Sequence, residues 1–156
     1  MKDSTLCLLI KDDKILLGMK KRGFGVGKWN GVGGKFDFSK DKDILGAAIR
    51  ETKEEIGVSP NSLNKVAFLR FHFPNKEEWS QNVHVFLIDK WDGDPEESEE
   101  MRPQWFEVKE IPYASMWDDD KFWLPHILAG KKIDADFVFG DGEKIASHNI
   151  NFVSGF

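Results

Sequence analysis

In the first third of the chain, hydrophobic residues first form short continuous runs and then recur at helical spacing. This pattern predicts two strands followed by a helix. Apolar runs at Thr5–Ile10 and Ile15–Met19, separated by a short acidic turn, predict a buried strand that turns back into a partner strand. Apolar residues then recur at helical spacing from Ile44 to Ile56. Gly57 follows directly, so this segment predicts a helix that ends at a glycine.

The second half of the chain predicts mainly strands, because apolar and polar residues alternate along it. The expected strands are Lys65–Phe73, Asn82–Asp89, Gln104–Val108 and a terminal hairpin of Asp134–Phe139 with Ile145–Phe152. A late helix is expected at Phe122–Leu128, started by the acidic triplet Asp118–Asp120 and limited by Pro125. The pattern as a whole indicates a mixed β-sheet with one central and one late helix.

Composition narrows the class of protein. A chain of 156 residues with 40% hydrophobic and 31% charged residues predicts one globular domain over residues 1–156. A net charge of −5 argues against a nucleic acid polymer as partner. No signal peptide and no run of about 18 apolar residues is present, so we expect no membrane span and a cytoplasmic protein. Cys7 is the single cysteine, which excludes a disulfide framework.

Two segments carry candidate chemistry. Glu51, Glu54 and Glu55 share one face of the predicted helix, and oxygen ligands of this kind suit Mg²⁺ or Mn²⁺. A solvated acidic helix face is the ordinary alternative for such a pattern. The basic, glycine-rich segment Lys20–Lys28 could hold phosphates, or it could be a flexible turn.

The glycine pair before the predicted helix, the acidic face and the glycine after it form one ordered signature. It resembles the Nudix box, G-x5-E-x7-R-E-U-x-E-E-x-G-U, in which U is an aliphatic residue. The matching positions are Gly34, Arg50, Glu51, Glu54, Glu55, Gly57 and Val58.

The match departs from the family pattern in two places. Thr52 replaces the first aliphatic residue of the helix. The loop is two residues longer than in the pattern, and its glutamate position falls on Lys42. Asp41 and Asp43 flank Lys42, and either is a candidate substitute for that glutamate.

The resemblance implies the α/β fold of the family, an α/β/α sandwich with a mixed sheet. Further segments, among them LLGMKKRGFG, KWNGVGGK, EMRPQWF and MWDDDKFW, resemble the animal members of the family that act on oxidised purine nucleotides. The implied reaction is Mg²⁺-dependent hydrolysis of 8-oxo-dGTP and 2-oxo-dATP to monophosphate and pyrophosphate, with O6-methyl-dGTP as a further candidate. The implied partner is a small nucleotide, bound by a monomer.

Site residues are carried over by position. The implied metal ligands are the Gly33 carbonyl, Glu51, Glu54, Glu55 and Glu100. Glu54 or Glu55 would remove the proton of the attacking water, Arg50 would orient a neighbouring carboxylate, and Lys20 would meet the phosphates. The implied base pocket consists of Thr5, Phe24, Asn30, Phe71, Phe73, Met101, Trp117, Asp119, Asp120, Trp123 and Phe139.

The base pocket has a physical rationale of its own. Trp117 can stack on a purine, and Asn30 offers both a donor and an acceptor. Two close carboxylates raise the pKa of one of them, so Asp119 and Asp120 could share a proton and read the edges of both oxidised guanine and 2-oxoadenine. In the alternative interpretation, the aromatic residues are core and Asp118–Asp120 only starts a helix.

Two other functions remain open at this stage. One is a Nudix hydrolase of another substrate, such as ADP-ribose or a dinucleoside polyphosphate. The other is a Nudix-fold binding module without catalysis, which the altered loop favours and the three helix glutamates disfavour. The four histidines are scattered without metal-ligand spacing, and no role is assigned to them.

Overall fold

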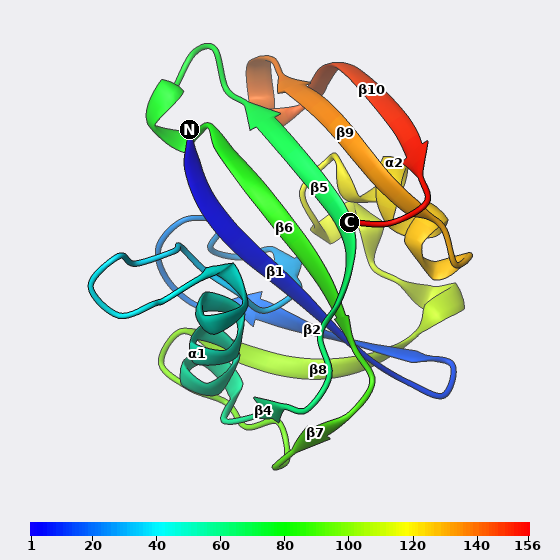
Figure 1. Ribbon diagram of the computed structural model, residues 1–156. Helices are drawn as coiled ribbons and strands as arrows, with labels where there is room; N and C mark the ends of the chain where they lie inside the picture. The colour runs from blue at the N-terminus through cyan, green and yellow to red at the C-terminus, as the bar shows by residue number, and fades with distance from the viewer.

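The molecule is built on a mixed β-sheet, seen in a computed structural model that describes residues 1–156 (Figure 1). The strand order is β10-β9-β5-β6-β1-β2-β3, and β8 adds to β2. The pairs β1–β6 and β5–β9 are parallel, and the other pairs are antiparallel. The strands are β1 Lys2–Lys11, β2 Lys14–Lys20, β3 Trp29–Asn30, β5 Asn64–His72, β6 Gln81–Ile88, β8 Met101–Glu107, β9 Lys132–Phe139 and β10 Ile145–Val153.

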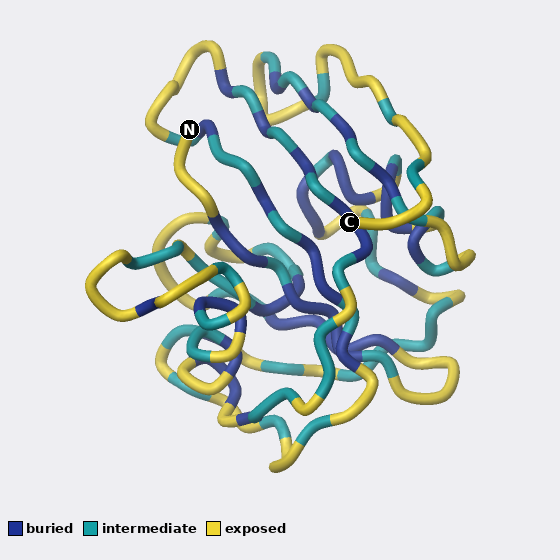
Figure 2. Tube along the Cα trace, viewed as in Figure 1, coloured by how far each residue is buried: buried dark blue, intermediate teal, exposed yellow.

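Helices cover both faces of this sheet. Helix α1 (Ile44–Ile56) packs against β1 and β8, and helix α2 (Asp120–Leu128) packs against β9 (Figure 1). Adjacent residues of β1 point to opposite faces, so Leu8 enters the core under α2 while Cys7 enters the core under α1. The two cores make the α/β/α sandwich that the family resemblance implied. The buried stretches follow the strands, and the loop tips are exposed (Figure 2).

Helix α1 has the bounds that the sequence predicts, because both of its ends are capped. The Asp43 side chain accepts a hydrogen bond from the Gly46 N–H at 2.8 Å. Gly57 adopts a left-handed conformation with φ of 73°, and its N–H bonds the Lys53 carbonyl at 2.9 Å. These caps fix the length of the helix that carries the acidic residues.

Strand β8 begins at Met101, three residues before the expected start at Gln104. Pro103 lies inside β8, and because β8 pairs only with β2 and is an edge strand, its missing N–H is tolerated. The longer strand pairs Met101 with Lys20, the last residue of β2, and so places the neighbouring Glu100 at that end of β2.

Several short elements are absent from the sequence prediction. The segment expected as a polar turn at Asn75–Ser80 contains a 3₁₀ helix, η1 (Glu77–Trp79). A small ribbon pairs β4 (Ser59–Pro60) with β7 (Trp91–Asp92). The remaining 3₁₀ helices are η2 Val108–Glu110, η3 Tyr113–Ser115 and η4 Asp141–Glu143. None of the helices combines the length and the apolar character that crossing a membrane requires.

Replacing Asp43 tests the capping of α1. We expect Asp43→Ala to lower the free energy of unfolding by about 1 kcal/mol, because the Gly46 N–H loses its acceptor. Asp43→Asn keeps an acceptor oxygen and should stay close to wild type. Urea denaturation measures both variants, and equal losses in the two would contradict the capping role.

Candidate active site

A cavity of about 790 Å³ opens beside β1, where the sheet face that packs under α2 continues beyond the core. One end is lined by the acidic residues of α1 and by Glu100, and the other by aromatic residues and two aspartates. The predicted site residues that line it are Thr5, Lys20, Phe24, Asn30, Gly33, Glu51, Glu54, Glu55, Phe71, Phe73, Glu100, Met101, Trp117, Asp119, Asp120 and Phe139.

The glycine pair holds α1 against β1. The Thr5 N–H donates to the Gly34 carbonyl at 2.9 Å, and the Gly33 N–H donates to Glu55 Oε1 at 2.7 Å. A Cβ on Gly33 would lie 2.0 Å from the Thr5 carbonyl oxygen, and one on Gly34 would lie 2.4 Å from the Glu51 carboxyl carbon. Only glycine allows this approach of backbone, strand and carboxylates.

Cations separate the acidic residues at this end of the cavity. Lys20 Nζ lies 3.6 Å from Glu55 Oε2 and 3.5 Å from Glu100 Oε2. Arg22 also bonds Glu100, and this hydrogen bond lowers the pKa of that carboxyl group. Burial raises the pKa of Glu51, and it raises the pKa of Glu55 to about 7.

Arg50 bonds the acidic residues around it from behind the cavity. Its Nε and one terminal nitrogen contact the two oxygens of Asp41 at 2.7 and 2.8 Å, and the other terminal nitrogen bonds Glu51 at 2.9 Å and Glu54 at 3.1 Å. The guanidinium lowers the pKa of Asp41, whose carboxylate is buried in the longer loop. That loop is otherwise largely exposed (Figure 2).

The structure therefore separates the two candidate substitutes for the missing loop glutamate. Asp41 forms the bidentate pair with Arg50, whereas Asp43 caps α1. The Asp41 carboxylate also accepts a hydrogen bond from the Asp37 N–H at 2.9 Å, so the ion pair closes the loop on itself.

The donors at this end suit a hard divalent cation. Glu51, Glu54, Glu55, Glu100 and the Gly33 backbone face one cavity and offer oxygen ligands. In the arrangement described, no three His, Cys, Asp or Glu side chains are gathered closely enough to form a ligand set. The carboxylates instead bond Arg50 and Lys20, because like charges at these distances need a cation between them.

Asp119 and Asp120 are almost completely buried at the far end of the cavity, with 4% and 3% of their surface exposed. Trp123 Nε1 donates to Asp119 Oδ2 at 2.7 Å, whereas Asp120 Oδ2 has no partner in the protein. Burial raises the pKa of both carboxyl groups above the ordinary value, and their mutual repulsion is the smaller cause for Asp120. Repulsion, the cause expected from the sequence, therefore comes second to burial for the pKa of Asp120.

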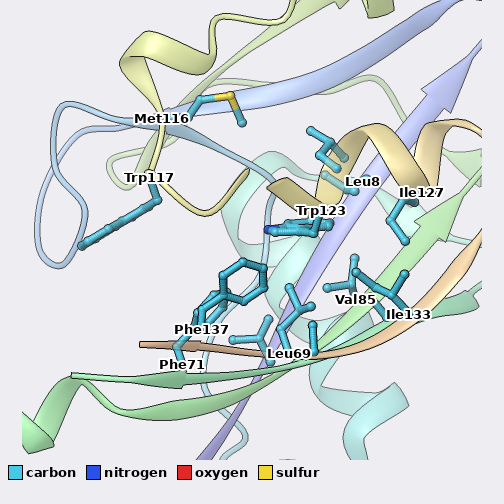
Figure 3. Close-up of a cluster of buried hydrophobic side chains, with 14 of the residues drawn as sticks. Leu8, Leu69, Phe71, Val85, Met116, Trp117, Trp123, Ile127, Ile133 and Phe137 are labelled. Carbon is cyan, nitrogen blue, oxygen red and sulfur yellow. The ribbon is translucent and has the colours of Figure 1, made fainter. Parts of the chain in front are cut away.

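Aromatic rings form the walls around these acids. Phe24 stacks on Trp117 with ring centroids 5.0 Å apart, and Phe73 stacks on Phe139 at 4.3 Å. Trp117 lines the cavity and lies at the margin of the buried cluster, apart from the other labelled side chains in Figure 3. Four aromatic residues thus belong both to the core and to the cavity wall, namely Phe71, Phe73, Trp117 and Phe139.

Trp123 corrects the predicted base pocket. It does not line the cavity, only 1% of its surface is exposed, and it lies in the middle of the hydrophobic cluster (Figure 3). Its position on α2 directs the ring into the core and leaves only the indole N–H for Asp119. Trp123 is therefore a positioning residue for that carboxyl group.

Some lining residues have no role predicted from the sequence; around Trp79 to Gln81 the family resemblance implies a pocket residue, but the match does not fix which one. Trp79, from the segment expected as a polar turn, packs its ring edge-on against Phe24 at 5.1 Å. The other lining residues without a predicted role are Lys2, Ser4, Leu6, Gly25, Gly31, Gly34, Lys35, Glu78, Gln81 and Val83. Strand alternation places Ser4 and Gln81 on one sheet face, but only the β1–β6 register reveals that they meet.

Comparisons with known proteins identify the family of this chain. The model of the NUDIX domain matches residues 1–127. The chain is 45% identical over 152 residues to the oxidized purine nucleoside triphosphate hydrolase of Mus musculus, covering 97% of this chain and 96% of that protein. It is 43% identical over 149 residues to the protein of the same name from Danio rerio, covering 96% and 94%.

A solved structure shows the same fold at low sequence identity. The crystal structure of a MutT protein from Bacillus halodurans superimposes with a TM-score of 0.84 at 21% identity, covering 97% of this chain and 98% of that one. With the family model over most of the chain and near full-length relatives, this chain belongs to the Nudix family of hydrolases.

Proposed function

We propose that this chain hydrolyses oxidised purine nucleoside triphosphates, 8-oxo-dGTP and 2-oxo-dATP among them, to monophosphate and pyrophosphate with Mg²⁺, and so removes damaged nucleotides from the pool. One observation carries the proposal. The buried Asp120 oxygen without a partner lines an aromatic cavity that continues to a carboxylate-lined end. Such an atom needs a ligand to satisfy it, and a purine edge offers donors there. The two vertebrate relatives named for this activity support the same assignment.

The carboxylate end is suited to the triphosphate. Nudix hydrolases use divalent metal ions. Glu51, Glu54, Glu55, Glu100 and the Gly33 carbonyl are the groups that would hold Mg²⁺, with Mn²⁺ as a substitute. The bound ion would neutralise phosphate charge and lower the pKa of a coordinated water. Lys20 adds a positive charge between Glu55 and Glu100 that can meet the phosphate oxygens.

The glutamates of α1 also supply the proton acceptor. The Gly33 N–H fixes Glu55 Oε1, which leaves Oε2 directed toward Lys20 in the cavity. A carboxylate held in this way by the backbone keeps one oxygen positioned to accept a proton from a water in the cavity. Glu54 is the more exposed candidate, bonded only by Arg50. These contacts favour Glu55 as general base and Arg50 as the residue that orients Glu51 and Glu54.

The aspartate end is suited to reading the purine. At neutral pH, burial keeps a proton on this pair, so the two carboxyl groups present a donor and acceptors side by side. Trp117 and Phe24 offer aromatic surface to the base. The Asn30 Oδ1 accepts a hydrogen bond from the Gly31 N–H, so the Asn30 side-chain nitrogen is the group left to donate to a ligand. An exchangeable proton lets one pocket pair with both oxidised guanine and 2-oxoadenine. The expected monomeric, single-domain and cytoplasmic character stays a prediction.

A substrate panel tests the proposal. We expect Mg²⁺-dependent pyrophosphate release from 8-oxo-dGTP and 2-oxo-dATP to exceed release from dGTP and ADP-ribose, and chelation by EDTA to abolish it. O6-methyl-dGTP belongs in the same panel. Glu55→Gln should lower kcat by about 100-fold or more, because the general base is lost, with an unchanged unfolding curve. A preference for ADP-ribose, or ligand binding without any turnover, would support the alternatives instead.

Asp41→Asn tests which aspartate replaces the loop glutamate of the Nudix box. Without the bidentate pair, Arg50 is less firmly held, and we expect the Mg²⁺ concentration for half-maximal activity to rise by roughly 10-fold. Asp43→Asn is the matched control on the other side of Lys42 and should leave this concentration unchanged. The opposite ranking of the two variants would overturn the assignment of Asp41.

The buried aspartates predict a pH dependence of stability. Above the ordinary pKa of 3.8 the unfolded chain loses the Asp120 proton while the folded chain keeps it, so the free energy of unfolding falls as pH rises. Asp120→Asn removes this group and should flatten the decline by up to about 1.4 kcal/mol per pH unit between pH 4.5 and 7. Urea denaturation at several pH values measures the slope.

Asp118 provides the control for that experiment. Its pKa is lowered by the hydrogen bond from the Ile145 N–H at 2.8 Å, so it is ionised in both states across this range. Asp118→Asn should therefore leave the slope unchanged. Identical slopes for wild type and Asp120→Asn would rule out a buried protonated Asp120.

A further inference from the structure

Two neutral polar side chains, Ser4 and Gln81, lie on the sheet face that forms one wall of the cavity. Strand alternation puts Ser4 beside Leu6 on β1, and Gln81 beside Val83 on β6. The register pairs Gln81 with Phe71 of β5 on its other side. Ser4 and Gln81 therefore place neutral polar groups next to the apolar side chains of Leu6, Val83 and Phe71, and they do so from strands.

Ser4 fixes the carboxamide of Gln81. Ser4 Oγ donates to Gln81 Oε1 at 2.7 Å, and only 6% of the Ser4 surface is exposed. With its oxygen held in this way, the amide leaves its NH₂ group as the free donor, and that group bonds no other protein atom. Gln81 lines the cavity, so the free donor is available to a bound molecule.

This donor complements the two acids that line the same cavity. Asp119 and Asp120 meet the hydrogen-bonding edge of a purine, whereas the Gln81 NH₂ can only donate and therefore needs an acceptor. Oxidised purines carry a carbonyl oxygen at C8 or C2 that the unmodified bases lack, and the sugar carries a hydroxyl oxygen. Both oxygens belong to the nucleoside, and both accept hydrogen bonds.

We propose that Gln81 is a specificity-determining residue whose amide, oriented by Ser4, donates a hydrogen bond to an oxygen atom of the bound nucleoside. This inference rests on the proposed function, because it names a further contact in the same cavity. One neutral hydrogen bond corresponds to a change of roughly 2- to 10-fold in binding. Lys2 and Phe71, the strand neighbours of Gln81, keep its backbone in place when the side chain is changed.

The experiment compares Gln81→Met, which keeps the length of the side chain without the amide, with Gln81→Glu, which keeps acceptor oxygens without the donor. Asn82→Ala is the matched control, because Asn82 points to the opposite face of β6. For each variant, kcat/KM is measured on 8-oxo-dGTP, 2-oxo-dATP and dGTP, and calorimetry measures the Kd of 8-oxo-dGMP. Both Gln81 variants should lose roughly 2- to 10-fold on the oxidised nucleotides, mainly in KM, and Asn82→Ala should lose nothing.

Two comparisons in this experiment show whether the acceptor oxygen belongs to the base or to the sugar. If the acceptor is the base carbonyl, Gln81→Met loses more on 8-oxo-dGTP than on dGTP. If it is the sugar hydroxyl, both substrates lose the same factor, and on a 3′-deoxy analogue of 8-oxo-dGTP the variant equals wild type. Gln81→Met values within 2-fold of wild type on every substrate and in the Kd of 8-oxo-dGMP would overturn the proposal.

Ser4→Ala tests the orienting bond. It should lose less than Gln81→Met, and in the Gln81→Met background it should add nothing, because its only partner is already gone. Additive losses would assign Ser4 a separate structural role and contradict the proposal. If wild type does not hydrolyse oxidised purine triphosphates, the proposed function fails, and the calorimetric Kd of 8-oxo-dGMP still decides the role of Gln81.

Discussion

The contact between the Gly33–Gly34 backbone and β1 at Thr5 is the constraint on which the site depends. It leaves no room for a side chain, since a Cβ on Gly33 would overlap the Thr5 carbonyl. The same peptide donates its N–H to Glu55, so the strand, the glycine segment and α1 are fixed in one arrangement. A buried carboxylate that is held by a backbone N–H keeps one oxygen oriented and the other free. The position of the acidic face thus follows from backbone packing as much as from helix geometry.

The two ends of the cavity hold buried carboxyl groups in different ways. At the α1 end, Lys20 and Arg50 offset the charge of the glutamates, although burial still raises the pKa of Glu55 to about 7. At the far end no cation contacts Asp119 or Asp120, and burial favours the protonated form. One end therefore keeps negative charge available for a cation and a polyanionic substrate, whereas the other keeps a proton available for a base. A single cavity can serve both parts of a nucleotide because its two ends differ in compensating charge.

The sequence predicted the fold well where local signals agree. Helix α1 has the predicted bounds because the Asp43 cap and Gly57 mark both ends, and the β9–β10 hairpin follows from alternation around a glycine turn. Local patterns failed where tertiary contacts decide. Trp79 lies in a segment that the sequence predicts as a polar turn, but in the structure its ring packs against Phe24 and Phe73.

The prediction of the site residues from the sequence was limited in the same way, because tertiary contacts decide which side chains face the cavity. Nearly all of them line one cavity, but periodicity could not separate Trp123, which faces the core, from Trp117, which faces the cavity. The Ser4–Gln81 hydrogen bond spans residues that are far apart in the chain, and it depends on the parallel register of β1 and β6. Alternation within each strand predicts which residues share a face, but it does not show which residues of two distant strands lie side by side. The main cause of the raised pKa values of Asp119 and Asp120 is burial, which local sequence patterns do not show.

The longer loop shows how geometry can replace spacing in a sequence motif. A guanidinium needs a carboxylate at hydrogen-bond distance and in its plane, and it places no demand on the number of residues between them. Arg50 finds that partner in Asp41, one position from the place where the family pattern has a glutamate. Because Asp is one methylene shorter than Glu, the backbone must come closer, and the Asp37 N–H bonds the same carboxylate from within the loop. The turn between Asp37 and Asp41 therefore brings the shorter acid to the arginine, and the same guanidinium bonds Glu51 and Glu54 of α1.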